Sequence, residues 1–410
     1  MVDATRAVGC ADRPALRRCV GGNLDDFGSD HWGQVPLLTL ADELPRGFED
    51  LLSLTAAGEL LSRRGLRTPF IRIARGGVVA DPSRFTRPGG TGAMVADQVA
   101  DDRVLDLFAD GHTIVLQGLH RLWPPLIDFA GDLTTDLGHP VQVNAYITPT
   151  NAQGFTAHYD THDVFVLQVA GRKKWCVHSP VIKDPLPSQP WTDRRSDVQA
   201  RATEPPTLEA TLQPGDALYL PRGYLHSAEA LGETTLHLTV GVHPLTRYDV
   251  VSAVVALAAD EADLRQSLPL RDDDGAALTR AVAAAVDVLA GHLGTVSIDD
   301  LVHNVSARGV RAARPAPVDP IVQAAALAVL NADTRVVLRR NLRATVRLRD
   351  DEVELTLPDR VVRLPAAAFD ALGLLLRGGV VRLGEFPALT EAEALTLVRQ
   401  LIRNGVVEAC

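Results

Sequence analysis

The residues best suited to chemistry are two histidines and one aspartate. His158 and Asp160 stand two positions apart in the segment HYD, and His226 closes the later segment GDALYLPRGYLH. Positions i and i+2 of a strand point to the same face, so His158 and Asp160 can hold one metal ion while His226 arrives from another strand. Two imidazoles and one carboxylate make the facial triad that leaves open positions on iron(II). We therefore expect His158, Asp160 and His226 to be ligands of Fe(2+).

The surroundings of His226 favour this interpretation. A lone His-x-Asp pair is weak evidence, because a strand-end histidine hydrogen-bonded to an aspartate explains it as well. The segment before His226 has the spacing of the second cupin signature, with Gly215, Pro221 and Gly223 in place. These residues turn the chain so that His226 faces the interior of a barrel. The other nearby histidines, His162, His237 and His243, are interpreted as structural residues or as residues that support the ligands. His162 lies close enough in sequence to His158 and Asp160 to be a rival metal ligand.

A lysine follows the metal motif in the segment FVLQVAGRKKW. A hairpin turn at Ala170 and Gly171 would return the chain antiparallel and place Lys173 and Trp175 on one face, toward the barrel interior. A buried ammonium without a partner is costly, so Lys173 needs an anion. A dicarboxylate such as 2-oxoglutarate would supply it, with its 2-oxo acid end on the metal and its far carboxylate on Lys173. The neighbours Arg172 and Lys174 are assigned to a solvated turn.

Several elements must position these groups. Short apolar or alternating runs broken by glycine and proline fill residues 23–247 and are typical of a sandwich or barrel, with helices interposed near 48–63 and 122–137. Alanine-rich helical patterns follow over 248–312, where the helices would pack closely together or against a second subunit. Residues 320–410 alternate as strands before a helix that begins after a Thr390 and Glu393 capping box, which suggests a winged-helix-like unit. Residues 1–22 are left as an N-terminal tail.

The motifs resemble those of the JmjC-type cupin oxygenases of the ribosomal-oxygenase group. The resemblance rests on NAY from Asn144, on GFTAHYDTHDVFVLQVAGRKKW from Gly154 and on PGDALYLPRGYLH from Pro214, with DHWGQVPLL similar to the opening segment of that group. It implies a mainly β catalytic domain, the JmjC double-stranded β-helix, followed by a helical dimerisation segment and a C-terminal winged-helix-like α+β domain. After Tyr248 the match is one of pattern only.

The resemblance also implies roles for individual residues. His158, Asp160 and His226 would hold iron, and Lys173 would bind the far carboxylate of 2-oxoglutarate. Asn144 would lie beside the co-substrate, Tyr146 would touch the substrate, and Thr239 is a loose match to a hydroxyl residue near the co-substrate. The implied activity is hydroxylation of a protein side chain, histidyl or arginyl by default, on a ribosomal protein. No catalytic acid or base is assigned, because the protein groups hold the metal and position the reactants.

Composition bears on partners and compartment. The net charge of -10 fits a basic protein partner and disfavours nucleic acid and anionic membranes. The N-terminus lacks an apolar core of signal-peptide length, so a cytoplasmic protein without membrane contact is expected. The four cysteines are Cys10, Cys19, Cys176 and Cys410. They are scattered without a CxxC pair, which disfavours disulfides and zinc ribbons.

Other functions stay open at this point. The enzyme could instead tailor a peptide or small-molecule natural product, or be a metal cupin that does not use 2-oxoglutarate. A non-enzymatic protein would combine a vestigial barrel with a nucleic-acid-binding winged helix, near an arginine cluster between Arg335 and Arg349. The expected recognition helix, 366–376, is almost wholly apolar and belongs to a core, so the arginines are interpreted as a solvated or partner-facing surface.

Overall fold

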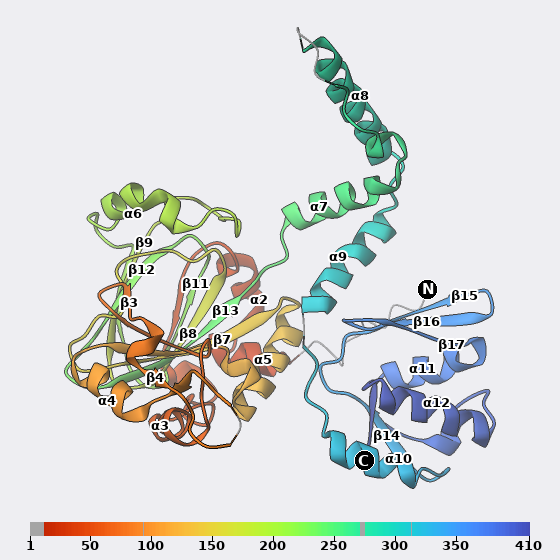
Figure 1. The fold of residues 1–410 in the computed structure, drawn as a ribbon, viewed down its shortest axis with the longest axis horizontal. Coiled ribbons are helices and arrows are strands. Elements are labelled where there is room, and N and C mark those ends of the chain that lie inside the picture. The colour runs from red at the N-terminus through yellow and green to blue at the C-terminus, as the bar shows by residue number, and fades with distance from the viewer. Residues whose placement is uncertain (1–11, 93, 271–274, 313) are drawn as a thin grey trace.

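The computed structural model describes residues 12–92, 94–270, 275–312 and 314–410. Two sheets form the body of the first domain (Figure 1). The larger sheet has the strand order β1-β11-β8-β13-β7-β6-β2-β3, and the smaller has the order β10-β9-β12. The strands of the larger sheet are β1 (Leu37–Thr39), β2 (Ile71–Arg75), β3 (Val78–Val79), β6 (Thr113–Leu116), β7 (Val141–Thr148), β8 (Asp163–Ala170), β11 (Ala217–Leu220) and β13 (Thr235–Val242), and those of the smaller are β9 (Lys173–His178), β10 (Leu208–Leu212) and β12 (Leu225–Ala230).

Strand β8 shows why this sequence makes a two-layered domain. Its residues are almost continuously buried. Phe165 and Leu167 belong to the core beneath the outer helices, whereas Val164 and Val166 pack with Trp175 between the two sheets. An apolar run without alternation is what a strand covered on both faces requires. The mainly β architecture expected for residues 23–247 is therefore present, with helices on the outer face of the larger sheet.

Helices and a small two-stranded sheet decorate this domain. The helices are α1 (Pro14–Val20), α2 (Leu24–Asp26), α3 (Leu54–Arg63), α4 (Asp101–Ala109), α5 (Pro124–Leu137) and α6 (Arg195–Arg201), and the strands are β4 (Thr86–Arg87) and β5 (Gln98–Val99). The expected tail is corrected over α1, whose residues Leu16 and Cys19 are buried in the main core. The Asp136 carboxylate fixes this helix by accepting from the amides of Ala15 and Leu16. Cys10 lies outside the described residues, and the other cysteines are free thiols.

A helical arm follows the barrel, composed of α7 (Arg247–Leu257), α8 (Ala276–Leu293) and α9 (Ile298–Ala312). The helices expected over 248–312 are present. Helix α7 packs against α9, whereas α8 projects away from the rest of the molecule (Figure 1). None of the α8 side chains is buried, and α8 is long and apolar enough to cross a membrane by length and composition alone. That criterion is weak for a single helix, so the expectation of a protein without membrane contact stays a prediction.

The C-terminal unit has its own core. It contains α10 (Pro320–Ala328), β14 (Arg335–Leu338), β15 (Thr345–Arg349), β16 (Glu352–Thr356), β17 (Val361–Pro365), α11 (Phe369–Leu376), β18 (Val380–Arg382), α12 (Glu391–Arg403) and β19 (Val407–Ala409). The capping box of Thr390 and Glu393 is present at the start of α12. Leu372 and Leu375 of α11 are buried, as the apolar sequence of that helix indicates. The helices and the β15-β16-β17 sheet fit the expected α+β composition, and the winged-helix assignment stays a prediction.

The arginine cluster has a role different from the one expected. Arg340 pairs with Asp128 of α5, and the amide of Asn341 donates to Asp132 of the same helix at 3.1 Å. Arg343 reaches the carbonyl of Gly138 at the end of α5. Part of the cluster therefore contacts the first domain of the same chain. We call this set of contacts, Arg340, Asn341 and Arg343 on α5, the interdomain clamp.

Candidate metal centre

The structure brings His158, Asp160 and His226 together. One ligand atom from each residue lies within 4.8 Å of the others, and the His226 Nε2 atom is 3.7 Å from Asp160 Oδ2. The backbone sets this arrangement, because His158 and His226 exchange amide hydrogen bonds of 2.9 and 3.2 Å as an isolated bridge. The amide of Gly223 in the expected turn donates to the Asp160 carbonyl at 3.0 Å. The sequence placed His158 and Asp160 within a strand, whereas they precede β8, which begins at Asp163.

Both histidines have the tautomer that a metal requires. The Nδ1 atom of His158 lies 2.8 Å from the Thr156 carbonyl, and that of His226 lies 3.1 Å from the Tyr224 carbonyl. A carbonyl oxygen can only accept, so Nδ1 carries the proton in each ring and Nε2 keeps its lone pair for a metal. The donor set of two Nε2 atoms and one carboxylate fits a divalent iron ion.

The charge states also fit a metal. Burial lowers the pKa of His226 to about 4, with the charge of His158 adding to the effect. Burial acts to raise the pKa of Asp160, but the nearby His162, His226 and His158 outweigh it and hold that pKa below its usual value. At neutral pH these groups are a neutral imidazole and a carboxylate, which are the forms that bind metal ions.

Lys173 lies in the same cavity as the triad, a space of 360 Å³. It is buried, and its Nζ atom donates to Thr148 Oγ1 at 3.0 Å and lies 3.4 Å from His237 Nδ1. Among the described residues, no carboxylate pairs with it. Burial lowers the pKa of the Lys173 ammonium to about 7, and burial with the Lys173 charge lowers the pKa of His237 well below its usual value. A buried lysine with only neutral neighbours is a site for an anion.

Trp175 lines the same cavity, on the face of β9 shared with Lys173 as the sequence predicts. Its indole is buried, and Nε1 has no hydrogen-bond partner in the part of the chain that the structure describes. A buried indole normally finds an acceptor, because an unpaired N–H is costly. The cavity therefore offers at least two donors to an anionic guest, and these are the Lys173 ammonium and the Trp175 N–H.

The remaining predicted residues are divided between two cavities. Tyr146 and Thr239 line both the 360 Å³ cavity and a larger neighbour of 810 Å³. Asn144 lines only the larger one, and its side-chain oxygen accepts from the amide of Gly118 at 3.0 Å. Tyr146 stacks on His237 with ring centroids 4.9 Å apart, and burial, with the charge of Asp160, raises the pKa of its phenol to about 12.

Sequence reasoning missed Arg72 and Thr148. Arg72, on β2, lines both cavities, lies over the ring of Phe155 and faces the Tyr146 hydroxyl and Asp160. Thr148, at the end of β7, accepts the hydrogen bond from Lys173. The alternation of β2 and β7 marks both positions as strand residues, but nothing local to either one indicates a site. His162, the rival ligand, lines the larger cavity and lies outside the triad.

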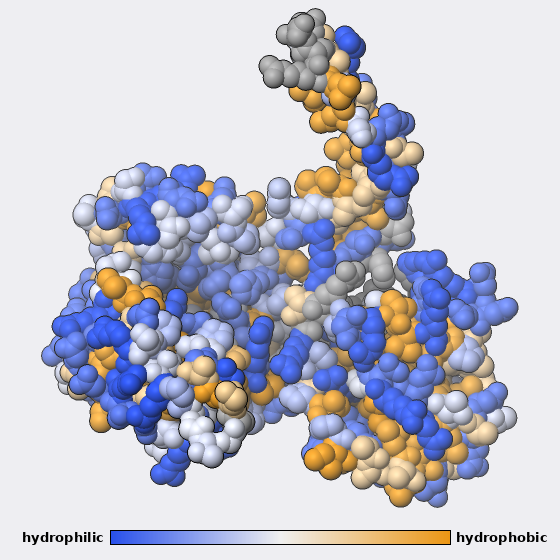
Figure 2. Space-filling model, viewed as in Figure 1, coloured by the Kyte–Doolittle hydropathy of each residue, from blue (hydrophilic) through white to orange (hydrophobic). Residues whose placement is uncertain are grey.

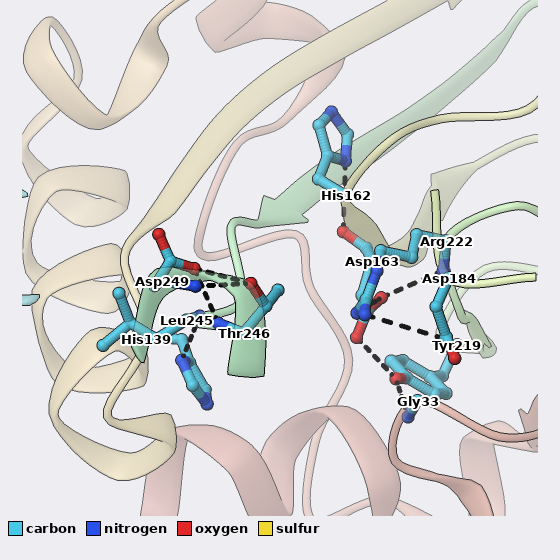
Figure 3. Close-up of polar contacts among 10 residues, drawn as sticks. All are labelled: Gly33, His139, His162, Asp163, Asp184, Tyr219, Arg222, Leu245, Thr246 and Asp249. Carbon is cyan, nitrogen blue, oxygen red and sulfur yellow. Dashed lines mark hydrogen bonds and ion pairs between the residues drawn. The ribbon is translucent and has the colours of Figure 1, made fainter. Parts of the chain in front are cut away.

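The buried carboxylate of Asp163 lies in a network of polar contacts with Tyr219 and Arg222 (Figure 3). Asp163 accepts from the Tyr219 hydroxyl and from the Arg222 amide, each at 2.9 Å, and Tyr219 in turn accepts from the Gly33 amide. Burial raises the pKa of Asp163 despite these donors. Because Arg222 belongs to the turn before His226, Asp163 fixes the segment that carries the third ligand.

Comparisons with known proteins agree with this geometry. Residues 130–250 match the model of the JmjC domain. The chain is 38% identical over 153 residues to ribosomal oxygenase 1 of Rattus norvegicus, which covers 36% of this chain and 25% of that protein. It is 37% identical over 265 residues to the bifunctional lysine-specific demethylase and histidyl-hydroxylase NO66 of Culex quinquefasciatus. That alignment covers 60% of this chain and 37% of that protein. The chain thus spans well under half the length of these curated relatives.

Solved structures share the fold over almost the whole chain. The E. coli protein ycfD superimposes with a TM-score of 0.60 at 16% identity, covering 95% of this chain and 99% of that one. The E. coli ribosomal oxygenase YcfD in complex with cobalt and 2-oxoglutarate gives a TM-score of 0.56 at 15% identity, with the same coverage. At this identity the likeness establishes the fold alone.

Proposed function

Because the chain belongs to the JmjC ribosomal-oxygenase group, we propose that it is an iron(II)- and 2-oxoglutarate-dependent oxygenase that hydroxylates an amino-acid side chain of a protein. One observation carries the proposal. The triad of His158, Asp160 and His226 shares a 360 Å³ cavity with the buried Lys173, which has no counter-ion there among the described residues. Those are the groups needed to hold a metal and an anionic co-substrate together.

The residues of the chain do the binding and the positioning. Iron(II) with 2-oxoglutarate supplies the oxidising chemistry, in which oxidative decarboxylation accompanies hydroxylation of a C–H bond. Lys173, with Thr148 as its neighbour, would hold the far carboxylate, and Trp175 offers a second donor nearby. The buried apolar walls of Val164 and Val166 exclude water from the space between lysine and metal.

The substrate would enter past Tyr146 and Thr239, which line both cavities. Asn144 fixes the wall of the larger cavity through the Gly118 amide. A histidyl or arginyl side chain is the default target, and a ribosomal protein is the default substrate. This choice follows the names of the relatives, which include a histidyl-hydroxylase and a ribosomal oxygenase.

The test is incubation of the full chain with iron(II), 2-oxoglutarate and isolated ribosomes, followed by mass spectrometry of the ribosomal proteins. We expect succinate and the gain of one oxygen on one side chain, both abolished by Lys173→Ala. Succinate formation without oxygen gain on any protein would move the assignment to a peptide or small-molecule natural product. Unchanged 2-oxoglutarate turnover in Lys173→Ala would end the assignment of that residue.

We propose further that the helical arm mediates homodimerisation. Apolar side chains of α8 stand exposed, among them Val282 and Val286, and the arm is orange along much of its length (Figure 2). Closely packed helices of a second copy would cover this surface, which a soluble monomer rarely exposes. Light scattering after gel filtration should give twice the monomer mass. A cytoplasmic location and a winged-helix identity for the C-terminal unit complete the proposal, with nucleic-acid binding not expected because α11 is part of the core.

A further inference from the structure

The larger cavity is built from several parts of the chain that are far apart in sequence. Its volume is 810 Å³, and its walls come from the strands β2 and β7, from helix α5, and from Ala312 and residues 314–316 on the way to the C-terminal unit. It shares Arg72, Tyr146, Asp160 and Thr239 with the cavity of the metal centre. A space of this size accommodates several residues of a peptide next to the metal.

The charge of this lining is unusual for an enzyme expected to act on basic proteins. Arg72, Arg121 and Arg314 all line the cavity, and Asp160 is the only acidic residue among the described residues of the lining. Asp160 belongs to the metal triad, so a bound metal ion would use its charge. The cavity wall therefore carries positive charge that the chain itself does not neutralise.

Arg121 and Arg314 are available to bind a guest, whereas Arg72 also faces the Tyr146 hydroxyl and Asp160. Within the described ranges, Arg121 and Arg314 have no ion-pair partner, and the Nε atom of Arg72 is buried without a hydrogen-bond partner. Histidines line the same cavity, among them His120 and His243. Burial, followed by the charge of Arg121, lowers the pKa of His120, and burial lowers the pKa of His243. These imidazoles are neutral and do not add to the charge, so the arginines set the electrostatic character of the cavity.

We propose that this cavity holds the substrate polypeptide and that Arg72, Arg121 and Arg314 select a segment with carboxylate side chains beside the target residue. The inference rests on the proposed function, because it names the substrate class of the same site. Guanidinium groups pair with carboxylates in a bidentate geometry and repel the lysines and arginines of a basic segment. The net charge of -10 suggested a basic partner, but the local charge at the site has the opposite sign.

The C-terminal unit takes part in this selection. Arg314 lies in the segment that forms one wall, and the chain continues from there to the interdomain clamp on α5. Arg339 also donates to the carbonyl of Ala316, another residue of that wall. The clamp residues are positioning residues, since they hold the wall without lining the cavity.

Fluorescence anisotropy of labelled peptides tests the proposal with the full chain. The probes are nonapeptides with one central histidine and two aspartates, two asparagines or two lysines on its flanks. We expect the aspartate peptide to bind about tenfold more tightly than the asparagine peptide, and the lysine peptide to bind most weakly. Arg121→Gln and Arg314→Gln should each reduce the aspartate preference about threefold, and Arg72→Gln should reduce it more. Arg335→Gln, an exposed arginine outside the cavity, is the matched control and should leave the preference unchanged.

The outcomes separate this inference from the proposed function. Equal binding of the peptides, a preference for lysine, absence of binding, or an unchanged preference in the arginine variants would overturn the inference. Oxygen transfer to lysine-flanked segments would overturn it while leaving the oxygenase assignment intact. An aspartate preference that depends on the three arginines, found in a protein that forms no succinate from 2-oxoglutarate, would support the inference and remove the oxygenase assignment.

Discussion

The barrel and the helical arm differ in which side chains they bury: the barrel encloses both apolar and charged side chains, whereas the arm leaves apolar side chains exposed. In the barrel, Phe165, Leu167 and Leu238 are completely buried, and the charged Asp163 and Lys173 are enclosed with hydrogen-bonding partners. In the arm, no residue of α8 is buried, and Val282 and Val286 are exposed to solvent. What the barrel lacks is small and polar or charged: an anion for Lys173, a metal for the triad, and acceptors for the buried Trp175 Nε1 and Arg72 Nε atoms. The arm exposes an apolar surface that the chain itself does not cover and that another molecule could cover.

This difference predicts that mutations will act on different quantities in the two regions. In the barrel, a changed residue should alter the affinity for a metal or co-substrate, because the missing partners are small and charged. In the arm, a changed residue should alter association, because the missing partner is an apolar surface. In the interdomain clamp, whose Arg340–Asp128 ion pair is solvent-exposed, a changed residue should alter the free energy of unfolding slightly and leave the affinity of the metal cavity unchanged.

The largest effect is expected at the metal centre. Asp160→Ala removes the one anionic ligand of the triad and should abolish tight metal binding, because two neutral imidazoles hold a divalent ion weakly. Anaerobic titration with cobalt(II), followed by its visible absorbance, measures this loss. Asp193→Ala, an exposed aspartate, is the control. Metal affinity within a factor of two of the wild type in Asp160→Ala would remove this residue from the ligand set.

The next effect concerns the co-substrate. Lys173→Met should weaken binding of 2-oxoglutarate by about 30-fold or more, because the far carboxylate loses a buried charged partner. The same change should raise the melting temperature of the co-substrate-free protein, since burial of the ammonium is no longer required. Lys174→Met, which loses only an exposed pair with Glu209 at 3.0 Å, should change neither quantity appreciably. A melting temperature that falls in Lys173→Met would contradict the burial argument.

The pH dependence of co-substrate binding follows from the same lysine. The folded-state pKa of Lys173 is lowered from 10.5 to about 7, so the ammonium is present below pH 7 and is lost as the pH rises above it. Binding of 2-oxoglutarate should therefore weaken about tenfold per pH unit above 7 and take up close to one proton there. Calorimetry in two buffers of different ionisation enthalpy measures the proton uptake. Proton uptake that is zero at both pH 6 and pH 8 would show that Lys173 keeps its charge throughout.

The arm should respond only in its association. Val282→Asp combined with Val286→Asp places two carboxylates on one face of α8 and should convert a dimer into a monomer. The affinities for metal and 2-oxoglutarate should stay within about twofold, because α8 lies far from the barrel (Figure 1). Val78→Asp, at another exposed valine, controls for added charge. Light scattering of the double variant at the mass of the wild type would show that α8 is not the interface.

The smallest effect is expected at the interdomain clamp. Arg340→Ala removes an exposed ion pair with Asp128, which contributes about 0.2–1 kcal/mol. The free energy of unfolding should fall by that amount at most, whereas the affinity for metal should not change. Chemical unfolding together with cobalt titration separates these two quantities. A large loss of metal affinity would mean that the clamp reaches the centre directly.

Much of the barrel and its metal site was accessible from sequence, because the relevant signals are local. The HYD segment, the turn at Pro221 and Gly223, and the alternation that pairs Lys173 with Trp175 each depend on neighbours within a few residues. The structure places these groups in one cavity. The position of His158 and Asp160 ahead of β8, rather than within a strand, was not predicted, because the bridge to His226 depends on a distant segment.

The sequence by itself determined which side chains can bind a metal and an anion, since their types and spacing are written in short stretches of chain. The tertiary structure decided what surrounds them. Arg72 of β2, Arg121 near α5 and Arg314 of the linker meet in one cavity only because the sheet, the helix and the clamp bring them there. No periodicity in the sequence relates these three positions. The net charge of the chain, -10, also gives no sign that the lining of this cavity is positively charged. The physical reason is that strand pairing and domain docking are long-range contacts, whose geometry is fixed by the packing of the whole core.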